Sequence, residues 1–234
     1  MRIAGIQKLS IVDYPSTLST VIFLQGCNFR CGYCQNPDLV SSAGETEYFE
    51  YEFFDFLQHV KEKKMIDAVV ISGGEPLIHS DLKDFLVKIK KNGFKIKLDT
   101  NGSFPDELVM LSREGLLDYV AMDIKTSLDK YSLVDIGDSK NTVSKVSKSI
   151  NILLSGSLPY EFRTTCLPGI VNDADFIKIG EIVKGALKYS LQQFRPYITL
   201  DEKFKEVKPY QREDFYHFES ILKKYVENVQ IVGI

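Results

Sequence analysis

The clearest indication of the fold is the segment Ala68-Val69-Val70-Ile71-Ser72-Gly73-Gly74-Glu75-Pro76. Its first four residues are apolar without alternation, which is typical of a strand buried on both faces of a parallel sheet. Two glycines follow, and they let the backbone approach a ligand closely because no Cβ blocks it. Proline then suits the first turn of a helix. The segment therefore predicts a strand that leads through a turn suited to ligand binding into a helix.

Outward from this segment, strand-like and helix-like patterns alternate along the chain. From Leu82, apolar residues recur at the i, i+3, i+4 and i+7 positions of a helix that faces a core on one side. Strands are expected at about 19–25, 67–72, 94–99, 118–123, 159–165 and 189–194. Helices are expected at about 49–64, 79–92, 105–114, 140–155, 173–185 and 209–226. Six such units predict an α/β fold, a partial (βα)6 TIM-like barrel with its active site at the C-terminal ends of the strands.

Length and composition fit one domain. The 234 residues are 44% hydrophobic and 26% charged, an ordinary globular balance, and no linker rich in glycine, proline or serine divides them. We expect a single domain over 1–234, with a barrel core at about 19–200 and a C-terminal helix and further strand within 209–234. That last strand is expected at 228–232.

Several classes of protein are disfavoured by the same data. No apolar run approaches the ~20 residues of a membrane helix, and the N-terminus lacks the apolar stretch of a signal peptide. We therefore predict a cytoplasmic protein without a membrane partner. A net charge of −3 disfavours general nucleic-acid binding.

Three of the four cysteines lie within eight residues, in Cys27-Asn28-Phe29-Arg30-Cys31-Gly32-Tyr33-Cys34. Such a cluster in a protein that needs no disulfides suits a metal or an iron–sulfur cluster. Three thiolates leave one coordination position open, where chemistry can occur. The alternatives are a zinc site completed by Cys166 or a histidine, and three unrelated buried cysteines. Cys166 by itself is expected to be a core residue.

Polar residues gather where the predicted strands end, which is the active-site face of a βα barrel. The candidate binding residues are Gly73, Gly74, Glu75, Asp99, Thr100, Asp123, Lys125, Arg163 and Gln193. The Glu75 carboxylate could pair with a cationic group, and Asp123 and Lys125 share one side of a strand, as binding of sugar hydroxyls or a carboxylate would need. Each set alone is also compatible with turn chemistry or a salt bridge at the rim.

The cysteine motif followed by Gly73-Gly74-Glu75-Pro76 resembles the radical S-adenosylmethionine superfamily. The segments around it resemble the glycyl-radical-enzyme activating proteins, and most of all the longer-type anaerobic ribonucleoside-triphosphate reductase activating proteins. These segments are 8–15, 23–31, 98–102, 122–125, 162–165 and 192–196. The resemblance covers nearly the whole chain.

The resemblance implies a 4Fe–4S cluster on Cys27, Cys31 and Cys34, whose fourth iron binds S-adenosylmethionine. An electron from a flavodoxin or ferredoxin-type donor would yield a 5′-deoxyadenosyl radical. That radical would abstract hydrogen from a glycine of a partner glycyl-radical enzyme, of the anaerobic ribonucleoside-triphosphate reductase or pyruvate formate-lyase type. The alternatives are a radical enzyme acting on a small molecule, such as a deazaguanine synthase, and a non-catalytic metal-binding interaction module.

The resemblance also implies roles for the residues at the strand ends. Gly73, Gly74 and Glu75 would hold the methionine amino group, and Arg163 would lie near the methionine carboxylate. Asp123 and Lys125 match cofactor-facing and substrate-facing positions, while Asp99 and Thr100 match a monovalent-cation site. One departure is Gln192-Gln193-Phe194, where a relative has a histidine that reaches the ribose; Gln193 is the expected substitute.

Overall fold

The computed structural model describes residues 1–41, 48–134 and 139–234. Contacts between Cα atoms divide these residues into two compact units, which are described separately. The first unit comprises Met1–Asn28, Asp38–Thr100 and Asp106–Val120. The second unit comprises Phe29–Pro37, Asn101–Pro105 and Ala121–Ile234. The expectation of a single domain stays a prediction.

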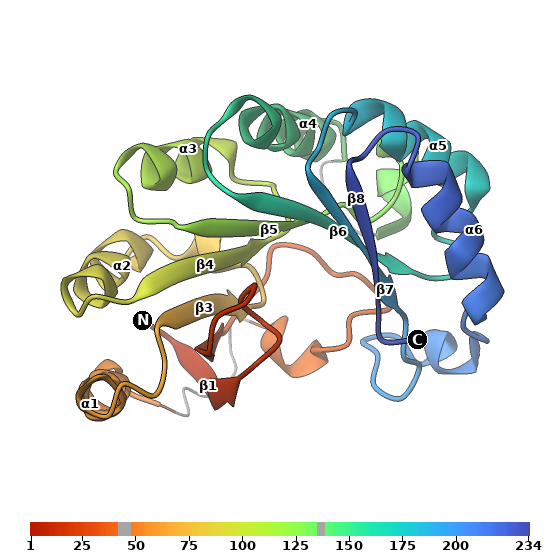
Figure 1. Ribbon diagram of the computed structural model, residues 1–234. Coiled ribbons are helices and arrows are strands. Elements are labelled where there is room, and N and C mark those ends of the chain that lie inside the picture. The colour runs from red at the N-terminus through yellow and green to blue at the C-terminus, as the bar shows by residue number, and fades with distance from the viewer. Residues whose placement is uncertain (42–47, 135–138) are drawn as a thin grey trace. The chain divides into compact units, whose positions relative to one another are not determined.

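The first unit is built on four strands that lie side by side in chain order (Figure 1). They are β1 (Ile3–Ser10), β2 (Ser19–Leu24), β3 (Ala68–Gly73) and β4 (Lys95–Thr100). β1 is antiparallel to β2, whereas β2, β3 and β4 are parallel, with Ile71 of β3 opposite Ile22 and Leu98. The helices of this unit are η1 (Pro37–Leu39), α1 (Glu50–Glu62), η2 (Pro76–Ile78), α2 (Leu82–Lys91) and α3 (Pro105–Arg113). The first residues of η1 and α3 belong to the second unit.

The second unit repeats the parallel α/β pattern. β5 (Tyr119–Asp123) begins in the first unit and ends in the second. It is followed by β6 (Tyr160–Cys166), β7 (Lys188–Gln193) and β8 (Asn228–Val232), which pair in parallel. The helices are η3 (Leu128–Val134), α4 (Ser139–Ser155), α5 (Asp173–Ile182), η4 (Glu202–Glu206) and α6 (Arg212–Leu222). α5 and α6 pack through Phe176 and Phe218, whose ring centroids are 4.6 Å apart.

The interior follows the apolar pattern of the sequence. Ala68 to Ile71 of β3 are completely buried, so this strand is covered on both faces as a parallel strand should be. α2 buries the stripe that begins at Leu82, while the lysines between these positions remain outside. α5 begins at a capping box in which the Asn172 side chain accepts from the Asp175 N–H.

All the predicted strands and helices are present, with ends displaced by a few residues, as is usual at element termini. The strand expected at 228–232 is confirmed as β8. β1 was not predicted, because Ile3–Ser10 contains glycine and lysine and three successive residues near its end are exposed. It is an edge strand that pairs with β2 and otherwise makes a single bridge from Ile3 to Tyr48, and such strands lack the continuous apolar run that identifies β3.

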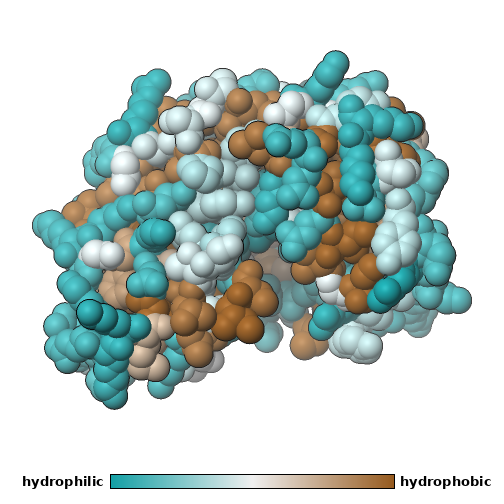
Figure 2. All heavy atoms as spheres, viewed as in Figure 1, coloured by the Kyte–Doolittle hydropathy of each residue, from teal (hydrophilic) through white to brown (hydrophobic). Residues whose placement is uncertain are grey.

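The surface visible in Figure 2 is mostly hydrophilic, with apolar side chains gathered over β1 and the loop that follows it. Ile11 and Val12 of this loop are 74% and 79% exposed. Within the described ranges, no helix combines the length and the apolar character needed to span a membrane.

Candidate functional site

The segment that leads into Cys27 is fixed by the backbone of the first unit. The Gly26 N–H donates to the Leu39 carbonyl at 2.8 Å, and the Cys27 N–H donates to the Val40 carbonyl at 3.2 Å. Gly26 has φ +99°, a left-handed conformation that a side chain would strain. Cys27 therefore follows a turn whose geometry requires glycine.

Cys31 and Cys34 belong to a tight turn of the second unit, in which the Cys34 N–H donates to the Cys31 carbonyl at 2.9 Å. The loop that contains η4 packs against this turn. The Asp201 N–H donates to the Gly32 carbonyl at 2.8 Å, and the Phe204 ring fills the space where a side chain of residue 32 would lie, 2.5 Å from an ideal Cβ. The turn is thus held by protein contacts of its own unit.

The four cysteines are free thiols. Cys31 is buried, whereas Cys27 and Cys34 are partly exposed. In the part of the chain that the structure describes, no three His, Cys, Asp or Glu side chains are placed to hold one metal ion. Cys166 is completely buried in β6, and burial raises the pKa of its thiol, so the prediction that it is a core residue is confirmed.

The Gly73-Gly74 turn is packed against backbone, which changes the reason for its glycines. An ideal Cβ at Gly73 would lie 2.3 Å from the Leu24 nitrogen, and one at Gly74 would lie 2.0 Å from the Gly26 carbonyl oxygen. The Gly74 and Glu75 N–H groups donate to the Leu24 and Gly26 carbonyls at 3.0 and 2.9 Å. Packing against the neighbouring chain therefore requires glycine at both positions, and the expectation that the backbone of this turn also approaches a ligand stays a prediction.

Glu75 is completely buried at the start of η2. Its Oε1 accepts from the Thr100 hydroxyl at 2.9 Å and from the Leu77 N–H at 3.1 Å. Glu75 thereby ties the end of β3 to the end of β4, and it brings two predicted site residues, Glu75 and Thr100, into contact.

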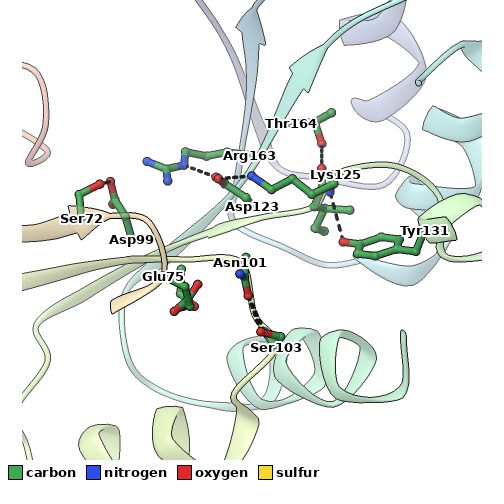
Figure 3. A network of polar contacts seen from close by, with 12 residues as sticks. Ser72, Glu75, Asp99, Asn101, Ser103, Asp123, Lys125, Tyr131, Arg163 and Thr164 are labelled. Carbon is green, nitrogen blue, oxygen red and sulfur yellow. Dashed lines mark hydrogen bonds and ion pairs between the residues drawn. The ribbon is translucent and has the colours of Figure 1, made fainter. Parts of the chain in front are cut away.

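Asp99 lies at the end of β4 and accepts from the Ser72 hydroxyl of β3 at 3.1 Å (Figure 3). The Lys97 ammonium lies 3.2 Å from Asp99 Oδ1, and the two side chains are only 4% and 13% exposed. Lys97 was not predicted as a site residue. The signal that could have found it is its position two residues before Asp99, which places both side chains on one face of the strand.

In the second unit, Asp123 at the end of β5 binds two cations, Lys125 just beyond this strand and Arg163 in the middle of β6 (Figure 3). Its carboxylate accepts from Arg163 Nε and from Lys125 Nζ, each at 2.8 Å. The three side chains are between 14% and 26% exposed. The group carries one positive charge in excess, and an anion such as a carboxylate could use that charge.

Asp123, Lys125 and Arg163, called the Asp123 triad below, stabilise one another's charges. Burial opposes ionisation of Asp123, but Arg163 and Lys125 hold the pKa of its carboxyl well below the usual range. Burial likewise opposes the charge of Lys125, but Asp123 and, less strongly, Cys31 raise the pKa of its ammonium well above the usual range. The influence of Cys31 indicates that the cysteine turn and the triad lie near each other within the second unit.

Two tyrosines complete the surroundings of Lys125. The Lys125 N–H donates to the Tyr131 hydroxyl at 3.2 Å. The Tyr33 hydroxyl, between Cys31 and Cys34 in sequence, is buried and has no hydrogen-bond partner among the described residues. Burial raises the pKa of Tyr33 well above its usual range, so this hydroxyl stays neutral and able to donate. Sequence reasoning assigned no role to either tyrosine.

Gln193, at the end of β7, donates from Nε2 to the carbonyls of Phe194 and Tyr210 at 3.2 and 3.3 Å. Both partners are backbone groups of the second unit. The suggestion that Gln193 replaces a ribose-contacting histidine stays a prediction. Of the predicted site residues, the first unit thus contains Cys27, Gly73, Gly74, Glu75, Asp99 and Thr100, and the second contains Cys31, Cys34, Asp123, Lys125, Arg163 and Gln193.

The shifted pKa values of the Asp123 triad predict that its contribution to the free energy of unfolding is constant around neutral pH. Because its pKa is depressed, Asp123 stabilises the fold above the unfolded carboxyl value of about 4, and this contribution is lost only as pH falls through the lower folded value. Lys125 has a raised pKa, so its contribution is complete below about 10 and is lost at higher pH. Asp123→Asn should lower the free energy of unfolding by about 2 kcal/mol, equally at all pH values between these limits. Urea unfolding of the cluster-free protein measures this difference; a difference that shrinks near neutral pH would contradict the assignment.

Comparison with known proteins adds independent information. The Radical SAM superfamily profile matches residues 21–182. A protein of Methanocaldococcus jannaschii, provisionally named a glycyl-radical enzyme activating enzyme, is 36% identical over 98% of this chain and 95% of its own length. The pyruvate formate-lyase-activating enzyme of Clostridium pasteurianum is 27% identical over 97% of this chain and 98% of its own length.

Solved structures show the same fold at low identity. Streptococcus suis SuiB bound to the precursor peptide SuiA has a TM-score of 0.68 at 14% identity over 91% of this chain. This chain spans 48% of SuiB. TYW1 with a lysine-pyruvate adduct has a TM-score of 0.61 at 19% identity, covering 88% of this chain and 73% of that one. The predicted fold class is confirmed as an α/β fold with a mainly parallel sheet, of the partial-barrel type and not a closed barrel.

The predicted resemblance is confirmed as well, because the matched profile covers more than half of the chain. The M. jannaschii relative aligns along nearly its whole length. The chain belongs to the radical SAM superfamily, whose cofactors are a 4Fe–4S cluster and S-adenosylmethionine.

Proposed function

We propose that this protein activates a glycyl-radical enzyme by generating a radical on a glycine of that partner. The observation that carries the proposal is the extent of the likeness to activating enzymes, which spans 98% and 97% of the chain in two relatives.

The residues present fit the two cofactors. Cys27, Cys31 and Cys34 would hold the cluster, since iron–sulfur clusters are bound by cysteine thiolates. The Tyr33 hydroxyl, buried beside this turn and without a partner in the described ranges, keeps an unused capacity to hydrogen-bond. When bound, the cluster and S-adenosylmethionine together supply the radical that removes a hydrogen atom.

The protein's own side chains would bind and orient the cofactor. The excess positive charge of the Asp123 triad suits the methionine carboxylate, to which the guanidinium N–H groups of Arg163 can donate. Asp123 favours the charged form of Lys125 and fixes the direction of Lys125 Nζ and Arg163 Nε. In the first unit, Glu75 and Thr100 fix the turn whose backbone is proposed to receive the amino group.

The proposed partner is a glycyl-radical enzyme of the anaerobic ribonucleoside-triphosphate reductase or pyruvate formate-lyase type. A flavodoxin or ferredoxin-type protein is the proposed electron donor. A cytoplasmic location, and the lack of nucleic-acid and membrane partners, stay predictions.

Electron paramagnetic resonance tests the proposal directly. The reduced protein, S-adenosylmethionine and a candidate partner should together give a doublet, because the unpaired electron on the glycine couples to its one remaining α-hydrogen. Changing the partner's loop glycine to alanine should remove the signal, and so should leaving out S-adenosylmethionine. Turnover of a free metabolite, with no signal from any glycyl-radical enzyme of the host, would instead favour the small-molecule alternative.

A further inference from the structure

A buried lysine on β4 is the starting point. The Lys97 side chain is 4% exposed, and its ammonium lies 3.2 Å from Oδ1 of Asp99, which is 13% exposed. A charge this well buried is unfavourable unless an opposite charge and hydrogen bonds compensate it. The Asp99 carboxylate supplies the opposite charge, so the two residues form an ion pair that is shielded from solvent.

Lys97 also reaches the loop between β1 and β2. Its Nζ donates to the Asp13 carbonyl oxygen at 2.6 Å, and the Asp13 carboxylate in turn accepts from the Ser10 hydroxyl at 2.5 Å. This is the loop that exposes Ile11 and Val12. One ammonium therefore joins the strand end at Asp99 to a surface loop of the same unit.

The contacts of Lys97 resemble those of a bound cation. Its ammonium lies close to one carboxylate oxygen and one carbonyl oxygen, and oxygen atoms of these kinds are what a hard metal ion selects. A side-chain ammonium in this position makes a solvent-derived cation beside Asp99 unnecessary, since it supplies the same unit charge through a covalently attached group.

We propose that Lys97 is the built-in counter-ion of Asp99, which takes the place of a bound monovalent cation and positions the β1–β2 loop. Lys97 is a positioning residue in this assignment, and the sodium or potassium site expected at Asp99 and Thr100 is replaced by its ammonium. That Asp99 serves the S-adenosylmethionine site rests on the proposed function, whereas its pairing with Lys97 can be tested without the cofactors.

The test compares Lys97→Met with Lys95→Met, a matched control at the exposed first residue of the same strand. Thermal unfolding of the cluster-free proteins is measured with tetramethylammonium as the only cation, and then with potassium or sodium at equal ionic strength. Wild type and Lys95→Met should unfold at midpoints that do not depend on the cation. Lys97→Met should unfold roughly 5–15 °C lower in tetramethylammonium, because a buried carboxylate has lost its positively charged partner, and should recover part of this loss in potassium or sodium.

Two results would overturn the proposal. A wild-type midpoint that rises with potassium or sodium would show that a metal ion is still needed, and equal behaviour of Lys97→Met and Lys95→Met would show that Lys97 is dispensable. If Lys97→Met does not fold, the double variant Lys97→Met/Asp99→Asn, which removes both charges, should fold. Its unfolding midpoint should not depend on the cation. Failure of the double variant to fold would also refute a role in charge compensation.

A separate measurement distinguishes failure of the proposed function. Titration of the cluster-loaded wild type with S-adenosylmethionine reports whether the cofactor binds at all. Absence of S-adenosylmethionine binding and cleavage would contradict the proposed function, but it would not affect the conclusion drawn from the unfolding comparison. If the cofactor binds, its affinity should be independent of potassium in wild type and should become dependent on potassium in Lys97→Met.

Discussion

Substitution of Cys31 by alanine is expected to reduce the iron of the anaerobically purified protein from about four atoms per chain to background. The same result is expected for Cys27→Ala and Cys34→Ala, because each thiol would be one of only three protein ligands. Cleavage of S-adenosylmethionine should disappear with the iron. Iron and sulfide analysis, together with the absorbance of the brown protein, measures the loss.

Cys166→Ala is the matched control for this experiment. The Cys166 thiol is completely buried in β6, and its Sγ lies 3.7 Å from the Thr164 carbonyl oxygen, where it fills core space. This variant should keep its iron. If Cys166→Ala lost the cluster while one of the three motif cysteines proved dispensable, the assignment of ligands would be wrong.

A single methyl group at Gly74 is expected to have the second large effect. An ideal Cβ there lies 2.0 Å from the Gly26 carbonyl oxygen and 3.0 Å from that of Leu39, and neither backbone can move cheaply. Gly74→Ala should therefore lower the free energy of unfolding by about 3 kcal/mol or more. Since Gly26 directly precedes Cys27, the yield of iron should fall as well.

Gly5→Ala provides the comparison, because an ideal Cβ at Gly5 meets only the Phe23 side chain, at an ordinary 3.6 Å. Urea unfolding of the two cluster-free variants should separate them clearly. Equal, small losses at both positions would mean that the turn can open to accept a side chain. In that case packing against the neighbouring backbone would not explain why residue 74 is glycine.

The main elements of the fold were predictable because burial leaves a direct trace in the sequence. The run Ala68 to Ile71 identifies a doubly covered strand, and the apolar stripe from Leu82 identifies a helix with one buried face. β1 leaves no such trace, since three successive residues near its end are exposed. An edge strand is defined by its partner, which a local pattern does not contain.

The sequence indicated most of the residues that form the candidate site, but it did not indicate which of them contact one another. Glycines at 73 and 74 indicate that something approaches the backbone closely, but only the structure shows that Leu24 and Gly26 do so. Lys97 is the reverse case, because the sequence did not indicate that this residue belongs to the site at all. A lysine is usually solvated, so its burial beside Asp99 depends on tertiary packing that the sequence of one strand cannot reveal.

The packing of Phe204 on Gly32 links two positions that are distant in the chain. With an ideal Cβ of residue 32 only 2.5 Å from the ring, a larger residue can enter the cysteine turn only if position 204 becomes smaller. The spacing of the three cysteines would be unaffected by either change alone, yet their turn would lose its support. Over evolutionary time the two positions should therefore change together, because the size of the side chain at position 204 limits which residues can occupy position 32.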